Sequence, residues 1–136
     1  MSRVVTERRI VDVLVSYLRA HYVVAREVKH YEKRIDVASI PITGGAVSTY
    51  EAKVADWSRA LSQAIVNLAA GDRAYIAMYS KNVHRVRLDS LHEYGIGLIS
   101  VGSKWGEVEE ILAAKPSPYL NRFASMRIRE QIKLKV

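Results

Sequence analysis

Two carboxylates and a lysine that could take part in catalysis lie in one short stretch of this 136-residue chain: Asp36, Glu51 and Lys53. Carboxylate oxygens are the ligands that a hard divalent cation such as Mg²⁺ prefers. A cation held in this way polarises a phosphoryl oxygen, and a nearby lysine can orient or deprotonate the attacking water. These residue types therefore suit Mg²⁺-dependent hydrolysis of a phosphodiester bond, with Mn²⁺ as a substitute cation.

The elements around these residues must bring them together. Residues 34–42 and 46–54 are strand candidates, and Gly44-Gly45 between them predicts a hairpin-type turn. Side chains two positions apart share one face of a strand, so the Glu-x-Lys pair points to one side. If the two strands pair across the turn, Asp36 joins that pair on the same face.

The rest of the chain predicts an α/β fold with a mixed central sheet flanked by helices, in the order α-β-β-β-α-β-β-α. One domain over residues 1–136 is expected, with the motifs in 1–80. The expected elements are a helix over 3–20, a strand over 21–29, a helix over 57–70 between Asp56 as N-cap and Gly71 as C-cap, strands over 73–79 and 96–101, a short helix or loop over 82–94, a segment over 107–114 that fits strand or helix, and a helix over 118–133 started by Ser117-Pro118.

The segments Ile35-Asp36 and Glu51-Ala52-Lys53, within this order of elements, resemble the PD-(D/E)xK nuclease superfamily, which has the restriction-endonuclease-like fold. The chain looks most like archaeal Holliday-junction resolvases and small RecB-like nucleases. The resemblance implies that Asp36 and Glu51 ligate the metal and that Lys53 acts on the water or the phosphate. The chain departs from the pattern at Ile35, where the family motif has proline.

The same resemblance implies further site residues. Resolvases of this type carry a glutamate in the first helix, a place that Glu7 fits, and RecB-like members carry a glutamine in the helix after the Glu-x-Lys strand, a place that Gln63 fits. An ordinary ion pair also explains Glu7, and surface polarity explains Gln63 equally well. Glu27 is a further acidic candidate, for which a surface pair with Lys29 or Arg34 is the favoured interpretation.

Charge points to a polyanionic partner. The chain has 21 basic and 14 acidic residues and a net charge of +7, with an acidic island over residues 35–56. This balance favours nucleic acid, and we expect DNA contacts from Arg34, Lys104, Arg122 and Arg129. Trp105, which follows Lys104 in a loop, is a candidate for contact with bases, whereas Trp57 fits the buried side of its helix.

Several classes of function are disfavoured. The absence of cysteine excludes a disulfide framework, a thiol nucleophile and a Cys-based zinc site. The four histidines lack metal-ligand spacing. Charges interrupt each apolar stretch before it reaches the length of a membrane span, so we expect no membrane partner and a cytoplasmic location.

We therefore expect a metal-dependent DNA endonuclease that processes junctions or branched DNA, working as a homodimer because such substrates present paired scissile bonds. One alternative is a non-catalytic DNA-binding protein that retains a nuclease fold. Another is a structural interaction subunit that docks through its basic C-terminal helix.

Overall fold

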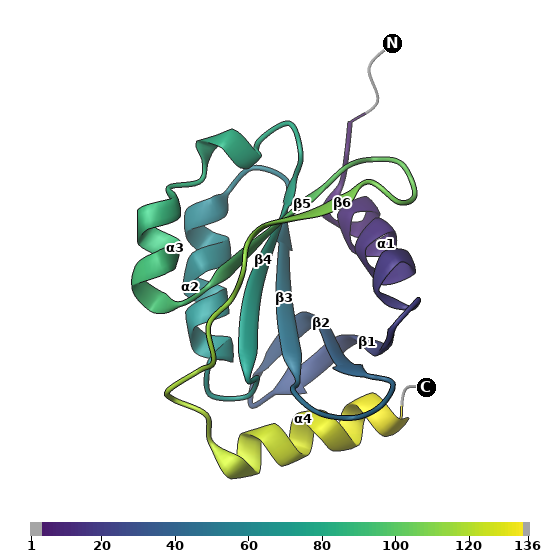
Figure 1. The fold of residues 1–136 in the computed structure, drawn as a ribbon, viewed down its shortest axis with the longest axis vertical. Coiled ribbons are helices and arrows are strands. Elements are labelled where there is room, and N and C mark those ends of the chain that lie inside the picture. The colour runs from purple at the N-terminus through teal and green to yellow at the C-terminus, as the bar shows by residue number, and fades with distance from the viewer. Residues whose placement is uncertain (1–3, 135–136) are drawn as a thin grey trace.

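The computed structural model describes residues 4–134, in which helices pack on both faces of a six-stranded sheet (Figure 1). Its elements are α1 (Glu7–Leu18), β1 (Tyr22–His30), β2 (Lys33–Pro41), β3 (Ser48–Lys53), α2 (Trp57–Asn67), β4 (Arg73–Tyr79), the 3₁₀ helix η1 (Val83–Arg85), α3 (Leu88–Tyr94), β5 (Gly97–Val101), β6 (Val108–Leu112) and α4 (Arg122–Leu134). The expected mixed α/β class and element order are confirmed. The segment 82–94 supplies η1 and α3, and the ambiguous segment 107–114 supplies β6.

The strands follow one another across the sheet in chain order, β1-β2-β3-β4-β5-β6. The pairs β1–β2, β2–β3 and β5–β6 are antiparallel, whereas β3–β4 and β4–β5 are parallel. Parallel neighbours need a crossover, and α2 and α3 supply the two crossovers. The carboxyl-terminal ends of β3, β4 and β5 consequently lie at the same edge of the sheet.

The two faces of the sheet are covered unequally. On one face α1 packs alone on a buried cluster that includes Val37, Tyr50 and Ala52. On the other face, α2 and α3 cover a cluster around Ile76 and Leu98, and α4 covers a third cluster under β1 and β2. Figure 1 shows α1 on one side, with α2 and α3 on the opposite side and α4 across one end.

Both terminal helices begin later than the sequence pattern predicts. Residue 3 lies outside the described residues, and α1 begins after Thr6, whose Oγ1 accepts a hydrogen bond from the Arg9 N–H at 3.1 Å. Val4, which lies inside the predicted range of this helix, precedes the observed helix and is 90% exposed. The later start follows from the cap, because a β-region Thr6 satisfies an N–H that a longer helix would bond internally.

The predicted start of the last helix at Ser117-Pro118 is wrong. Helix α4 begins at Arg122, and Asn121 Oδ1 accepts hydrogen bonds from the N–H groups of the two residues that follow Arg122. Ser117 Oγ instead donates to the Leu68 carbonyl at 2.6 Å, which ties this segment to the end of α2. Ser117 Oγ also accepts a hydrogen bond from the Tyr119 N–H at 3.2 Å, but no helix follows, because the Asn121 N–H bonds to the Ala69 carbonyl at 2.7 Å and not to a carbonyl one turn earlier.

Of the two caps predicted for the helix over 57–70, one is confirmed and the other is wrong. Asp56 is the N-cap of α2, and its Oδ1 accepts from the Arg59 N–H at 3.2 Å, as expected. Gly71 is not the C-cap: α2 ends at Asn67, and a Cβ at Gly71 would lie 2.8 Å from the Thr49 side chain. Glycine is therefore placed there for a close approach to β3. Within residues 4–134 no helix combines the length and apolar character needed to cross a membrane.

Candidate functional site at the fork between β2 and β3

The candidate site lies where β2 and β3 stop pairing. Their antiparallel ladder runs as far as the pair of Val37 with Tyr50. One further pair would place Asp36 opposite Glu51. The ladder does not continue. Asp36 Oδ2 instead accepts a hydrogen bond from the Ala52 N–H at 2.8 Å. A side-chain carboxylate thus takes the place of a backbone carbonyl and brings the two acidic residues together at the fork.

Strand β2 is also irregular on its other side. Glu27 of β1 and Asp36 fall between paired positions, and Glu27 has φ 49°, a value that non-glycine residues seldom adopt. Ile35 belongs to the cluster under α4, but Val37 belongs to the cluster under α1. The strict alternation that we assumed for this strand therefore breaks at Asp36, and the pairing with β1 is what breaks it.

Glu51 is a buried carboxyl group with unbalanced surroundings. Its side chain is only 3% exposed, and its Oε1 accepts from Asn67 Nδ2 at 2.9 Å. Burial raises the pKa of Glu51 to about 8, and the charge of Asp36 adds to the rise, while the Asn67 hydrogen bond and the charge of Lys53 oppose it. Two carboxyl groups that share a buried place behave in this way because their like charges disfavour joint ionisation.

Lys53 reaches from the end of β3 to the first turn of α1. Its Nζ lies 3.0 Å from Glu7 Oε1, with 16% of the lysine side chain and 54% of the glutamate side chain exposed. The N-terminal turn of a helix favours a negative charge, and the Thr6 cap fixes where that turn begins. The structure therefore brings four of the expected residues to one place, with Lys53 between Glu7 and the carboxyl pair.

Gln63, the fifth expected residue, lies on α2 one turn before Asn67, so the two share a helix face. Its Oε1 is buried and has no hydrogen-bond partner within the described part of the chain. Asn67 itself was not predicted from the sequence. The available signal was its place four positions after Gln63, which puts a second polar residue on the same face of the helix.

Asp36 opens into a cavity of about 470 Å³ beside α1. Its lining is mostly charged and comes from α1, β1 and β2: Glu7, Arg8, Val11, Arg26, Glu27 and Asp36. Arg26 forms a 2.6 Å ion pair with Asp12 across the helix–sheet contact. Asp36 is therefore the member of the carboxyl pair that lines the cavity, whereas the buried Glu51 does not.

The donor set for a metal is small. Within residues 4–134, no three histidine or acidic side chains gather closely enough to hold a metal ion by themselves. The pair Asp36 and Glu51 still fits Mg²⁺, which is usually bound by one or two carboxylates together with waters and substrate phosphates. The raised pKa of Glu51 fits as well, because a cation offsets the repulsion that opposes its ionisation.

The four residues expected to contact DNA do not gather on one surface. Arg34 is exposed and lies 3.7 Å from Glu27, while Lys104 lies in the loop between β5 and β6. Arg122 and Arg129 are on α4, which lies at the opposite end of the molecule from that loop (Figure 1). Arg129 is half-buried and pairs with Asp72 at 3.3 Å, so it serves the fold.

Trp105 lies in the β5–β6 loop and is 59% exposed, as expected of a contact candidate. The Arg9 guanidinium lies 4.4 Å from the centre of its ring, and Arg9 Nε donates to the Ser103 carbonyl at 2.8 Å. These contacts attach the loop to α1 near the candidate site. Trp57 is partly buried against the α2 cluster, as the helix pattern indicated.

Comparisons with known proteins define the fold and leave the activity open. No family model matches the chain, and no curated protein matches it. Among solved structures, a protein of unknown function from Silicibacter pomeroyi, SPO1766, aligns with a TM-score of 0.73 and 17% identity, over 98% of this chain and 87% of that one. SfsA from Pyrococcus furiosus, solved in complex with Ca²⁺, aligns with a TM-score of only 0.40 and 19% identity, over 80% of this chain and 61% of that one. At this identity the first match shows a shared fold.

Proposed function

We propose that the fork between β2 and β3 is the active site of a metal-dependent nuclease that hydrolyses phosphodiester bonds in DNA. One observation carries the proposal: two carboxyl groups from paired strands meet where the strands part, with Lys53 beside them. Such a constellation, with one strongly raised pKa next to a residue that lines a cavity, marks a candidate catalytic site. The net charge of +7 supports a polyanionic substrate.

The residues of this chain divide the work. Asp36 and Glu51 would hold a Mg²⁺ or Mn²⁺ ion, which supplies charge stabilisation at the phosphate when bound. The Ala52 N–H fixes Asp36 Oδ2 and the Asn67 amide fixes Glu51 Oε1, which would leave the other oxygen of each carboxyl group for a cation. Second donors of this kind orient metal ligands and hold them in place.

Lys53 is the group proposed to act on the attacking water or on the phosphate. Its ammonium group lies beside the carboxyl pair, and its pairing with Glu7 limits the positions that the long side chain samples. Glu7 thus positions Lys53 and adds a negative charge on the solvent side. Gln63, with its buried and unpartnered Oε1, is proposed to orient the substrate or Lys53 once the site is filled.

The test is a cleavage panel of labelled junction, duplex and single-stranded DNAs, with Mg²⁺ and with Mn²⁺. We expect metal-dependent cleavage by the full chain and its loss in Glu51→Gln and in Lys53→Ala. Lys115→Ala is the matched control, because Lys115 is an exposed lysine whose hydrogen bond is to His92. Cleavage that persists in Glu51→Gln would refute the assignment of the site.

DNA-binding measurements on the same protein distinguish the nuclease from the alternative function. DNA binding that weakens steeply with salt, without cleavage by any metal, would identify a non-catalytic DNA-binding protein instead. Absence of salt-dependent binding would remove nucleic acid as the partner. We also propose a homodimer, which sedimentation of the free and DNA-bound protein tests directly.

A further inference from the structure

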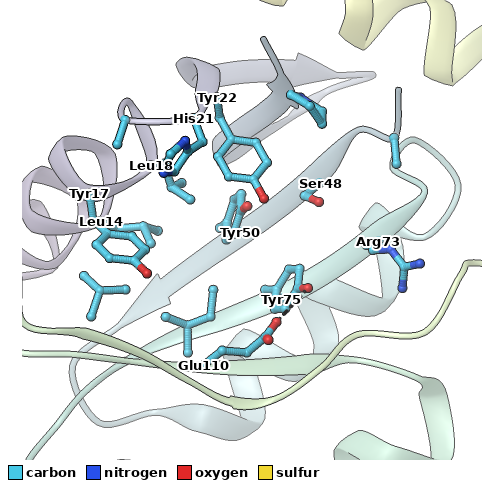
Figure 2. Close-up of a pocket in the computed structure, with 15 residues that line it drawn as sticks. Leu14, Tyr17, Leu18, His21, Tyr22, Ser48, Tyr50, Arg73, Tyr75 and Glu110 are labelled. Atoms are coloured by element: carbon cyan, nitrogen blue, oxygen red, sulfur yellow. Dashed lines mark hydrogen bonds between the residues drawn. The ribbon is translucent and has the colours of Figure 1, made fainter. Parts of the chain in front are cut away.

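A second cavity, of about 630 Å³, lies under the C-terminal end of α1, and four of the residues that line it are tyrosines (Figure 2). Leu14 and Leu18 of α1 and Ile99 of β5 form part of its apolar wall. Its tyrosines and charged residues come from five separate segments, with His21 and Ser48 beside them: Tyr17, Tyr22, Tyr50, Arg73, Tyr75 and Glu110. None of these residues belongs to the fork between β2 and β3, so the cavity is a distinct feature.

Two of the tyrosines form a fixed platform. Tyr50 of β3 and Tyr75 of β4 are cross-strand partners, and their rings stack with centres 5.3 Å apart and planes 13° apart. The next strand places Gly97 opposite Tyr75, where an added Cβ would lie 2.4 Å from the Tyr75 ring. Strand β5 therefore leaves room for the Tyr75 ring, because any residue larger than glycine at position 97 would displace it.

The hydroxyl groups of the platform are used differently. Tyr50 Oη lies 3.1 Å from Ser39 Oγ and is buried, so its polar group is satisfied inside the protein. Tyr75 Oη donates a 3.0 Å hydrogen bond to Glu110 Oε1, and Glu110 lies exposed on the edge strand β6. Burial and the neighbouring Glu110 raise the pKa of Tyr75. Tyr75 therefore remains a donor at neutral pH and holds Glu110 at the cavity.

The chemistry of the lining limits the ligand. Aromatic rings and aliphatic side chains favour a flat, apolar body, because stacking and burial both reward planar surfaces. The Glu110 carboxylate accepts hydrogen bonds, so it selects N–H donors on an edge of that body. Arg73, whose Nη1 donates to the Ala114 carbonyl at 2.6 Å, adds a positive charge to the lining. That charge disfavours a simple organic cation and favours a ligand with a phosphate group.

We propose that this cavity binds a guanine base, stacked against the tyrosines with its N–H edge toward Glu110 and a phosphate near Arg73. A guanine presents adjacent ring N–H and amino donors, which match a carboxylate. The same chemistry has two sources: a free guanine nucleotide, or an unpaired guanine in a nucleic acid strand. The inference does not depend on nuclease activity at the fork.

The test is calorimetric titration of the full chain with GMP, IMP and AMP. GMP has both donors, IMP keeps the ring N–H but lacks the 2-amino group, and AMP lacks both and places the lone pair of its N1 toward the carboxylate, so we expect affinity to fall in that order. Each lost hydrogen bond to the carboxylate should weaken binding about ten-fold. Tetramethylammonium is the competing probe, and we expect no displacement of GMP by it.

Variants assign the site. Glu110→Gln should weaken GMP about ten-fold, because the amide loses the charge and one acceptor oxygen. Tyr17→Ala, at a half-exposed ring on the rim, should also weaken GMP. Glu109→Gln is the matched control: Glu109 is the adjacent exposed glutamate and lines a different hollow. Circular dichroism of each variant confirms that it folds.

A short single strand with one central guanine, compared with oligothymidine of equal length, distinguishes the two sources. Binding of GMP alone supports a free nucleotide, and preference for the guanine-containing strand supports an unpaired base. Equal affinity for GMP and AMP, GMP affinity unchanged by Glu110→Gln, displacement by tetramethylammonium, or no binding of any guanine ligand at millimolar concentration would each overturn the proposal.

Discussion

The fork between β2 and β3 and the tyrosine cavity lie along the same helix, yet they use opposite physical devices. The fork borders the first turn of α1 and confines charge: two carboxyl groups, one of them buried, beside Lys53. The cavity borders the last turns of α1 and has a fixed shape, because the Tyr50 and Tyr75 rings stack over Gly97 and their hydroxyl groups are hydrogen-bonded. The fork is therefore poised to respond to cations and protons, and the cavity to the form of a ligand.

This difference has an architectural cause. One helix covers the α1 face, whereas three helices cover the other face, so space remains between the end of α1 and the strands beyond it. At the fork, by contrast, strand pairing fails locally and a side chain replaces the missing backbone bond. A region of excess space suits recognition, and a region of unbalanced charge suits chemistry.

The largest expected effect on the free energy of unfolding comes from replacing Gly97, the glycine under the Tyr75 ring of the cavity. Gly97→Ala places a Cβ within 2.4 Å of the Tyr75 ring and 2.7 Å of the Ala114 backbone nitrogen. We expect the free energy of unfolding to fall by ~3 kcal/mol, measured by urea denaturation. Gly44→Ala, where the added Cβ meets nothing within 4 Å but φ is +86°, should cost only about 1 kcal/mol. Equal costs would show that crowding under Tyr75 is not the cause.

The next effect concerns charge at the fork and is pH-dependent. The pKa of Glu51 is about 8 in the folded protein, against 4.5 for an unperturbed glutamate. The folded state therefore keeps a proton that the unfolded chain releases in this range, and stability falls as pH rises from about 4.5 to 8. Glu51→Gln should remove this loss and be on the order of 2 kcal/mol more stable than the parent at pH 9, with little difference at pH 4.

Thermal unfolding at several pH values measures this difference. Addition of Mg²⁺ at pH 8 should raise the melting temperature of the parent chain, because a cation favours the ionised carboxyl group, and should leave Glu51→Gln unchanged. A parent protein with flat stability across this pH range would contradict the proposed charge imbalance.

A smaller effect concerns the hydrogen bond that holds Glu110 at the cavity. Tyr75→Phe keeps the stacked ring and deletes only the donor, so the free energy of unfolding should fall by about 1 kcal/mol. Tyr31→Phe is the comparison, since Tyr31 is an exposed tyrosine in the β1–β2 turn. A double-mutant cycle of Tyr75→Phe with Glu110→Gln should show coupling; additive costs would separate the two residues.

The smallest effect on stability concerns Glu7. Its ion pair with Lys53 is more than half exposed on the glutamate side, and such pairs contribute little. We expect Glu7→Gln to change the free energy of unfolding by less than about 0.5 kcal/mol. Its effect on the pH profile of cleavage should be much larger, because Lys53 loses its positioning partner. A large loss of stability would instead make Glu7 a structural residue.

Sequence patterns predicted the fold well where neighbours along the chain decide the outcome. Strand 73–79 has the expected bounds, and Asp56 caps its helix, because alternation and capping are local properties. No helix starts at Pro118, because this segment is held to the distant end of α2 by the Ser117 hydroxyl and by the Asn121 N–H, which bond to the carbonyls of Leu68 and Ala69. The prediction that Gly71 caps its helix was wrong for a similar reason. Glycine is needed there because the Thr49 side chain approaches closely, and not because a helix ends.

The candidate site divides in the same way. Glu51 and Lys53 were candidates because strand alternation and the acidic island pointed to them, whereas Asp36 depended on an expected hairpin pairing and on the Ile35-Asp36 half-motif. Strict alternation did not predict the break at Asp36, which lies opposite Glu27 of β1 at a point where the β1–β2 pairing is interrupted. Asn67 was missed because its importance depends on the buried carboxyl group it contacts.

By itself, the sequence determined the order of elements, the mixed α/β class and the residue types available for chemistry, since these depend on local propensity and periodicity. Only the tertiary structure decided that Asp36 and Glu51 share one fork, that burial raises the pKa of Glu51, and that Tyr50, Tyr75 and Glu110 line one cavity. Those facts depend on pairings between strands distant in the chain and on the exclusion of water, which no local pattern encodes.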